Sequence, residues 1–122
     1  MIVIDYKDRR PIYEQIVERF QELILKGILE ADSQLPSVRN LAMELSINPN
    51  TIQKAYTELE RQGYIYSVKG KGSFIAITDQ LVKKKKEEIL EAATLLATLA
   101  KEYRVEKDQF INAISKGFKE ES

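Results

Sequence analysis

The stretch INPNTIQKAYTELERQG, residues 47–63, predicts an amphipathic helix with an unusual first turn. Asn48 can cap the helix, Pro49 fits its first position because no N–H is needed there, and Gly63 can end it. Apolar residues recur at helical spacing and predict a buried face, formed by Ile52, Ala55, Tyr56 and Leu59. The other face begins with amide and hydroxyl groups, whereas a merely solvated helix more often carries Glu and Lys there. The helix start therefore requires its own explanation.

The neighbouring segments predict the rest of a small domain. Residues 11–26 predict a first helix, with apolar positions Ile12, Ile16, Phe20, Leu23 and Ile24 and a stop at Gly27. Ser37 can cap a short second helix with an apolar face of Val38, Leu41, Ala42 and Leu45. After residue 63, the runs YIYSV and SFIAI, joined by KGKG, predict a β-hairpin. The order helix, helix, turn, helix, hairpin is that of a winged helix-turn-helix, a mainly α fold with a small hairpin.

The polar face of the third helix favours contact with DNA. Its short or hydrogen-bonding side chains can approach base edges and phosphates; they are Asn50, Thr51, Gln53, Lys54 and Thr57. The N-terminal turn of the second helix of such a motif enters the major groove, and its free N–H groups favour phosphate. The simpler alternative is a packed helix in a small bundle, for which the apolar stripe would look the same.

Two segments resemble the GntR family of bacterial transcription regulators, and its YtrA-type branch in particular. They are LPSVRNLAMELSINPNTIQKAYTELERQGYIYSVKGKGSFIA, residues 35–76, and PIYEQIVERFQELILKGIL, residues 11–29. The resemblance implies DNA contacts by Ser37, Arg39, Asn48, Asn50, Thr51 and Gln53, and by Lys69, Gly70 and Lys71 at the end of the hairpin. Some relatives carry arginines where this chain has Pro49 and Gln53, which alters base preference because Arg favours guanine whereas Gln favours adenine.

Composition restricts the other function classes. The 19 basic and 19 acidic residues balance, so DNA binding has to come from local charge, for which Arg39, Lys54, Lys69 and Lys71 are the candidates. The chain has no His and no Cys, which removes the usual catalytic pairs and zinc sites, so we expect no enzyme, metal or cofactor. The N-terminus is unlike a signal peptide, and no apolar run reaches membrane-spanning length, so we expect a cytoplasmic protein without a membrane partner.

We divide the chain into a DNA-binding domain, residues 1–79, and a two-helix dimerisation segment, residues 80–122. Heptad-like spacing predicts an apolar stripe, here called the tail seam, at Ile89, Ala93, Leu96, Ala100 and Tyr103. A second helix, residues 107–118, offers Ile111, Ile114 and Phe118 for the same contact. The alternative is that both helices fold back on the first domain. The run KKKK, residues 83–86, is either a solvated first turn or an additional DNA contact.

The resemblance implies a homodimeric regulator, usually a repressor, that binds a roughly palindromic double-stranded DNA operator near transporter genes. About a third of the chain follows residue 79, too little for an ordinary ligand pocket within one subunit, so a small effector would bind at the dimer interface. The rival function is a winged helix that binds another protein, which the neutral net charge permits. The two functions can be distinguished by salt, because affinity for DNA falls steeply as the salt concentration rises, which is not expected of a protein-binding face.

Overall fold

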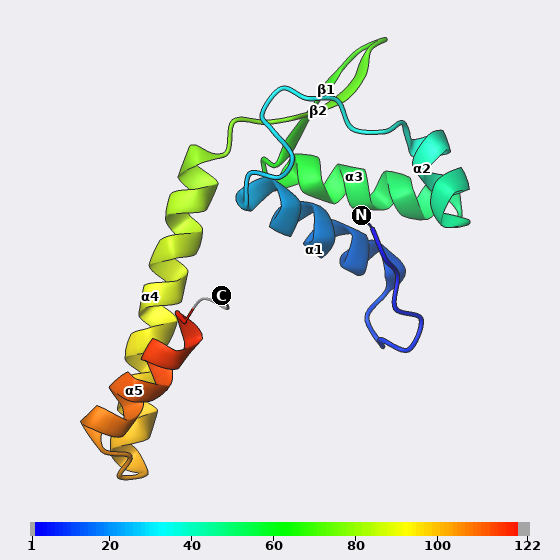
Figure 1. The fold of residues 1–122 in the computed structure, drawn as a ribbon. Coiled ribbons are helices and arrows are strands. Elements are labelled where there is room, and N and C mark those ends of the chain that lie inside the picture. Colours follow the sequence, from blue (N-terminus) through cyan, green and yellow to red (C-terminus); the bar gives the residue numbers. More distant parts are fainter. Residues whose placement is uncertain (1, 120–122) are drawn as a thin grey trace. The chain divides into compact units, whose positions relative to one another are not determined.

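The computed structural model describes residues 2–119, which form two compact units that meet between Leu81 and Val82. The first unit holds helices α1 (Ile12–Leu25), α2 (Val38–Leu45) and α3 (Pro49–Arg61) and strands β1 (Ile65–Val68) and β2 (Gly72–Ile75) (Figure 1). Helix α4 (Asp79–Glu102) starts in the first unit and continues into the second, where α5 (Lys107–Gly117) follows. The prediction of a mainly α winged helix-turn-helix with a tail of two helices is confirmed. Residue 1 of the predicted range 1–79 and residues 120–122 of the predicted range 80–122 lie outside the described residues.

Local signals start and stop the helices of the first unit. The Oγ atom of Ser37 accepts a hydrogen bond from the Asn40 N–H at 3.0 Å, and Asn48 Oδ1 accepts one from the Asn50 N–H at 2.8 Å. Pro49 occupies the first turn of α3, where it removes no hydrogen bond. Gly63 follows α3 with a φ of +86°, a conformation that glycine adopts without strain. These caps agree with the sequence prediction.

Helices α1 and α3 supply most of the core of the first unit. Ile16, Ile52 and Leu59 are fully buried, and Ile75 covers them from β2. The ring of Phe20 meets the ring of Tyr56 edge to face, with centroids 5.9 Å apart. The buried stripe of α3 is the predicted one, so its opposite face is left for solvent or a partner.

A third extended segment, residues 32–35, pairs with β2 of the antiparallel hairpin. The Asp32 N–H donates to the Ile75 carbonyl at 2.7 Å, the Leu35 N–H to the Ser73 carbonyl at 2.9 Å, and the Ile75 N–H to the Ser33 carbonyl at 2.9 Å. These bonds add a third, strand-like segment beside the two strands of the hairpin. Sequence reasoning treated this segment only as a connection.

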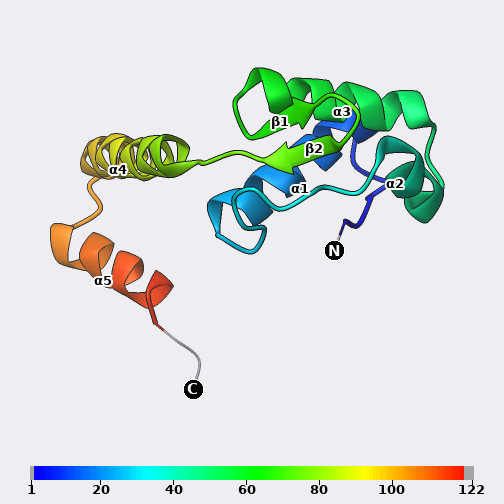
Figure 2. The same cartoon turned by 90° about the horizontal axis from the view of Figure 1, so that it is seen from above.

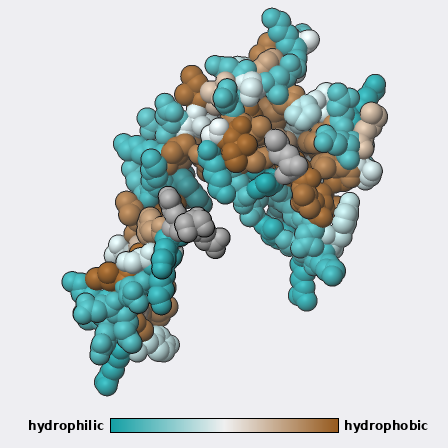
Figure 3. All heavy atoms as spheres, in the orientation of Figure 1, coloured by the Kyte–Doolittle hydropathy of each residue, from teal (hydrophilic) through white to brown (hydrophobic). Residues whose placement is uncertain are grey.

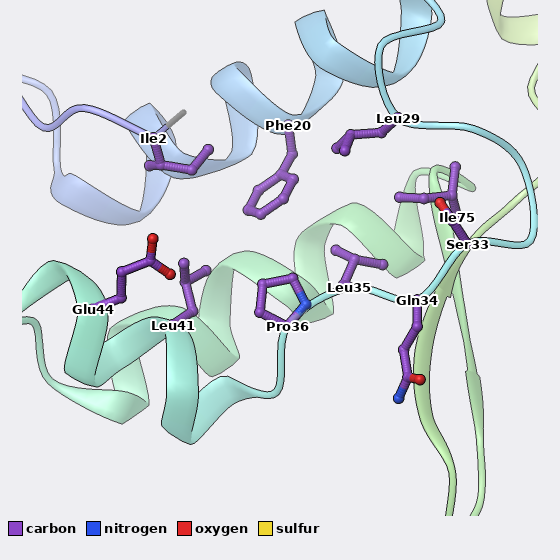
Figure 4. A pocket seen from close by; sticks show the side chains of 10 residues that line it. All are labelled: Ile2, Phe20, Leu29, Ser33, Gln34, Leu35, Pro36, Leu41, Glu44 and Ile75. Carbon is purple, nitrogen blue, oxygen red and sulfur yellow. The ribbon is translucent and has the colours of Figure 1, made fainter.

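A small apolar cavity lies between α1, α2 and the segment that precedes α2 (Figure 4). Its volume is about 100 Å³, and its lining includes Ile2, Phe20, Leu35 and Leu41. Ordinary ligand pockets measure about 300–1,000 Å³, so this space is a packing gap in the core.

Replacing Tyr56 by phenylalanine should lower the free energy of unfolding by about 1 kcal/mol. The Tyr56 hydroxyl donates to the Pro36 carbonyl at 2.7 Å, and its ring is buried, which also raises the pKa of the phenol. Urea unfolding at fixed protein concentration measures the loss. Tyr13→Phe is the control, because the Tyr13 hydroxyl makes only an exposed contact of 3.4 Å with Glu14. Equal losses in both variants would contradict this role of the Pro36 bond.

The second unit consists of helices without a core. Of residues 82–119, which the structure describes, none is buried. In Figure 2 α5 runs away from α4, and Figure 3 shows hydrophobic side chains on the surface of this unit. Six side chains predicted for the dimer contact are exposed, namely Ile89, Leu96, Tyr103, Ile111, Ile114 and Phe118. A contiguous exposed apolar surface is typical of an interaction site.

No helix formed by residues 2–119 is both long enough and apolar enough to cross a membrane.

Candidate nucleic-acid interface

The exposed tip of α3 is the central feature of the candidate interface. Asn48, Asn50 and Gln53 are exposed and Thr51 is half-buried, and all four surround the first turn of α3; this group is called the helix tip below. Helix α2 packs on α3 and is joined to it by a short turn in which Ser46 has a φ of +55°. Pro49 has no N–H, and the N–H groups of Asn50 and Thr51 donate to Asn48, so the helix tip offers a partner its side chains and the positive dipole end of α3.

Gln53 has a neighbour that orients its amide. Its Nε2 atom lies 3.3 Å from Thr57 Oγ1, one turn later on the same face of α3. That contact uses one N–H of the amide and leaves the other N–H and the carbonyl oxygen available. One donor and one acceptor on a flat amide match the N7 and N6 edge of adenine.

Arg39 projects from the first turn of α2 into solvent. Within residues 2–119 it forms no salt bridge, whereas Arg10 is paired with Asp8 and Glu18, and Arg61 with Glu58. Its guanidinium is therefore available for a base or a phosphate. Ser37 caps α2 through its oxygen lone pair, and its hydroxyl hydrogen remains free to donate to a phosphate oxygen.

Lys54 lies at the α1 side of α3 rather than beside the hairpin. Its Nζ atom sits 4.0 Å from the centre of the Tyr13 ring on α1, a cation–π contact. The contact holds the ammonium group at the edge of the interface, which suits a phosphate better than a base edge. Sequence reasoning included Lys54 in the interface but did not identify Tyr13 as its neighbour.

The turn of the hairpin carries two exposed lysines, one on each side of a glycine. Lys69, Gly70 and Lys71, called the wing tip below, are exposed, and the Lys71 N–H donates to the Val68 carbonyl at 2.9 Å. Gly70 has a φ of +77°, which an L side chain rarely adopts.

The first unit brings the wing tip together with the polar face of α3. An open groove of about 480 Å³ lies between the hairpin and α3 and is lined in part by Gln53, Lys69 and Lys71. Glu60 also lines it, but one of its carboxylate oxygens accepts a hydrogen bond from the Ser67 N–H at 3.2 Å.

Glu58 and Arg61 form an ion pair at the far end of α3. Arg61 and Gln62 donate hydrogen bonds to Glu58, which lowers the pKa of that carboxyl to about 2. At neutral pH the ionised pair of Glu58 and Arg61 carries no net charge. Positive charge in this region thus comes from Arg39, Lys54 and the wing tip, as the sequence indicated.

Comparison with known proteins gives a consistent result. The family model described as "Bacterial regulatory proteins, gntR family" matches residues 12–75. The chain is 51% identical over 76 residues to the HTH-type transcriptional repressor YtrA of Bacillus subtilis (strain 168), a match that covers 62% of this chain and 58% of that repressor. It is 38% identical over 114 residues to the uncharacterized HTH-type transcriptional regulator YhcF of the same strain, covering 89% of this chain and 91% of YhcF.

Solved structures share the fold over both units and over the first unit alone. A crystal structure of a transcriptional regulator from Oenococcus oeni has a TM-score of 0.78 and 30% identity, and covers 98% of this chain and 100% of its own. AraR(DBD) in complex with operator ORE1 has a TM-score of 0.53 and 30% identity, with 62% of this chain and 93% of that chain covered. The second of these similar domains is seen bound to an operator.

Proposed function

This chain belongs to the GntR family of bacterial regulatory proteins, and we propose that this DNA-binding transcription regulator is a repressor that binds a roughly palindromic operator as a homodimer. The observation that carries the proposal is the exposed helix tip beside an unpaired Arg39 and a wing tip with two lysines. A similar repressor and a similar operator-bound domain support it. The same features favour regulation over catalysis and a location in the cytoplasm, where bacterial DNA lies.

Each first unit would read one half of the operator. The helix tip enters the major groove, with Gln53 directed at a base edge and Asn50 and Thr51 near it. Arg39 reaches the same groove from α2, while Ser37 and Lys54 contact flanking phosphates. The wing tip places Lys69 and Lys71 at the adjacent minor groove or its phosphates. This arrangement combines base contacts, which specify sequence, with phosphate contacts, which position the protein.

The second unit would supply the dimer contact. Ile89, Leu96 and Tyr103 of the tail seam are 57%, 54% and 77% exposed, values that an isolated chain would not leave uncovered in water. Ala93 and Ala100 continue this stripe along α4, with Tyr103 directly after the last residue of the helix, and small side chains allow two helices to approach closely. Ile111, Ile114 and Phe118 of α5 add apolar surface. A second copy of the same heptad-like stripe is the partner that such spacing favours.

Dimerisation fixes what an operator must look like and where an effector would bind. Two identical reading units related by a twofold axis require two inverted half-sites, with centres about one or two helical turns apart. A small effector would bind between the paired tails, because the apolar cavity of about 100 Å³ in the first unit is smaller than an ordinary ligand pocket. Its binding would change the spacing of the two helix tips.

The decisive experiment selects bound fragments from the genomic DNA of the host and then measures binding to the recovered site. Fluorescence anisotropy should show an affinity that falls by roughly 1,000-fold between 50 and 200 mM salt, as expected for about six phosphate contacts in the dimer. A scrambled duplex of equal length is the control for sequence preference. A failure to enrich any sequence, together with binding that is insensitive to salt, would favour the protein-binding alternative.

A further inference from the structure

We propose that Gln34 is a positioning residue for DNA binding, which fixes the wing tip relative to α2 and α3. Its amide Nε2 donates a hydrogen bond to the Lys71 carbonyl at 2.8 Å, although the two residues lie 37 positions apart in the sequence. The inference rests on the proposed contact of the wing tip with DNA and adds the residue that orients it.

The backbone around Gln34 directs its side chain to the hairpin. Gln34 forms a β-bridge with Phe74, so successive side chains of this segment alternate in direction. Figure 4 shows both Leu35 and Gln34 among the residues that line the cavity; the Leu35 side chain points toward it, whereas the Gln34 side chain extends along the strands. Leu35 is buried, which anchors the segment in the core and leaves Gln34 free to reach the wing.

Gly72 is shaped to receive the Gln34 amide. It has a φ of +115°, and a Cβ atom built on it would lie 2.9 Å from Gln34 Nε2. A side chain at position 72 would push this amide away from the Lys71 carbonyl. The backbone conformation therefore favours glycine, and the close approach places the Lys71–Gly72 peptide against the Gln34 amide.

The segment that holds the wing tip also leads into the other DNA-facing elements. Pro36 accepts the Tyr56 hydroxyl hydrogen bond from α3, and Ser37 begins α2, which carries Arg39. The turn bond from Lys71 to Val68 closes the wing tip on itself without joining it to these helices. The backbone bonds between residues 32–35 and β2 reach as far as Ser73, and the Gln34 side chain extends this contact to Lys71 in the wing tip.

Loss of this bond should weaken operator binding through a less ordered wing tip. The lysines would then be ordered during binding, at a cost in affinity, instead of beforehand. Gln34→Met removes the donor with little change in side-chain length, and because Gln34 is exposed the fold should persist. We expect the variant to bind about 3- to 10-fold more weakly per half-site, the range for one lost hydrogen bond. Heteronuclear NOE values at Gly70 and Lys71 should fall in the free protein.

Gln21→Met is the matched control. It removes a different glutamine bond, from Gln21 Nε2 to Gln62 Oε1 at 2.6 Å, which joins α1 to the end of α3 away from the wing. This variant should bind the operator as the unmodified protein does. The decisive comparison repeats Gln34→Met in a chain with Lys69→Ala and Lys71→Ala, where its cost should shrink to less than about twofold because the wing lysines are gone.

Each other outcome points to a different failure. If the double-lysine variant binds weakly while Gln34→Met binds normally with an unchanged wing tip, Gln34 has no positioning role. If the cost of Gln34→Met is undiminished without the lysines, it acts elsewhere and the inference is wrong. If the double-lysine variant itself binds normally, the wing contact of the proposed function is wrong, and the role of Gln34 falls with it.

Discussion

Replacing Arg39 by alanine is expected to weaken operator binding by about 1–3 kcal/mol per half-site, or roughly 5- to 150-fold. The side chain is exposed and forms no salt bridge within residues 2–119, so the free protein should lose little stability. Its removal deletes a charge-assisted, bidentate contact, in which the guanidinium donates two parallel hydrogen bonds to the guanine edge or to a phosphate. Anisotropy titrations of the selected operator at two salt concentrations measure the loss.

Arg61→Ala provides the matched control for lost charge. Arg61 lies at the end of α3 and is already paired with Glu58, so its removal takes one positive charge from the same unit without touching the helix tip. We expect a change of less than about twofold, because exposed ion pairs contribute little. Equal affinity of the Arg39 variant and the unmodified protein would refute the assignment of α2 to the interface.

Replacing Leu96 by lysine should convert the protein to monomers with an intact first unit. Leu96 occupies the middle of the tail seam and is 54% exposed in the single chain, so it has apolar surface that a second copy could cover. Burying an ammonium group in an apolar contact is strongly unfavourable. Because two linked half-site contacts gain about 100- to 10,000-fold over one, operator affinity should fall by at least about 100-fold. Sedimentation equilibrium measures the mass of the variant in solution, and fluorescence anisotropy measures its affinity for the operator.

Thr98→Lys is the control for this second prediction. Thr98 lies two positions further along α4, which places it about 200° around the helix from Leu96 and off the tail seam. Its variant should remain a dimer and bind normally. A Leu96 variant that stays dimeric at the same concentration would remove the tail seam from the interface and favour the folded-back alternative.

The elements and caps could be predicted because their causes are local. Asn48 and Ser37 each accept a hydrogen bond from an N–H two or three residues away, and the stripe of α3 depends only on helical spacing. The exposed face of α3 followed from the same periodicity. The assignment of its side chains to DNA stays a prediction, since it concerns contacts with a partner.

The missed features all join residues that are distant in sequence. Nothing near Gln34 indicates a bond to Lys71, and the pairing of residues 32–35 with β2 spans about 40 positions. The contact of Lys54 with Tyr13 likewise depends on how α1 packs against α3. The close approach of Gln34 to Gly72 is likewise a contact between distant residues, whereas sequence reasoning attributed this glycine only to the turn.

The exposed apolar residues of the second unit bear on how the amount of active regulator would depend on the number of chains in the cell. The proposed pairing is bimolecular, so at low copy number the amount of dimer would rise with the square of the number of chains. Promoter occupancy then changes more steeply than synthesis does. Halving the number of chains at cell division would then lower the amount of dimer about fourfold.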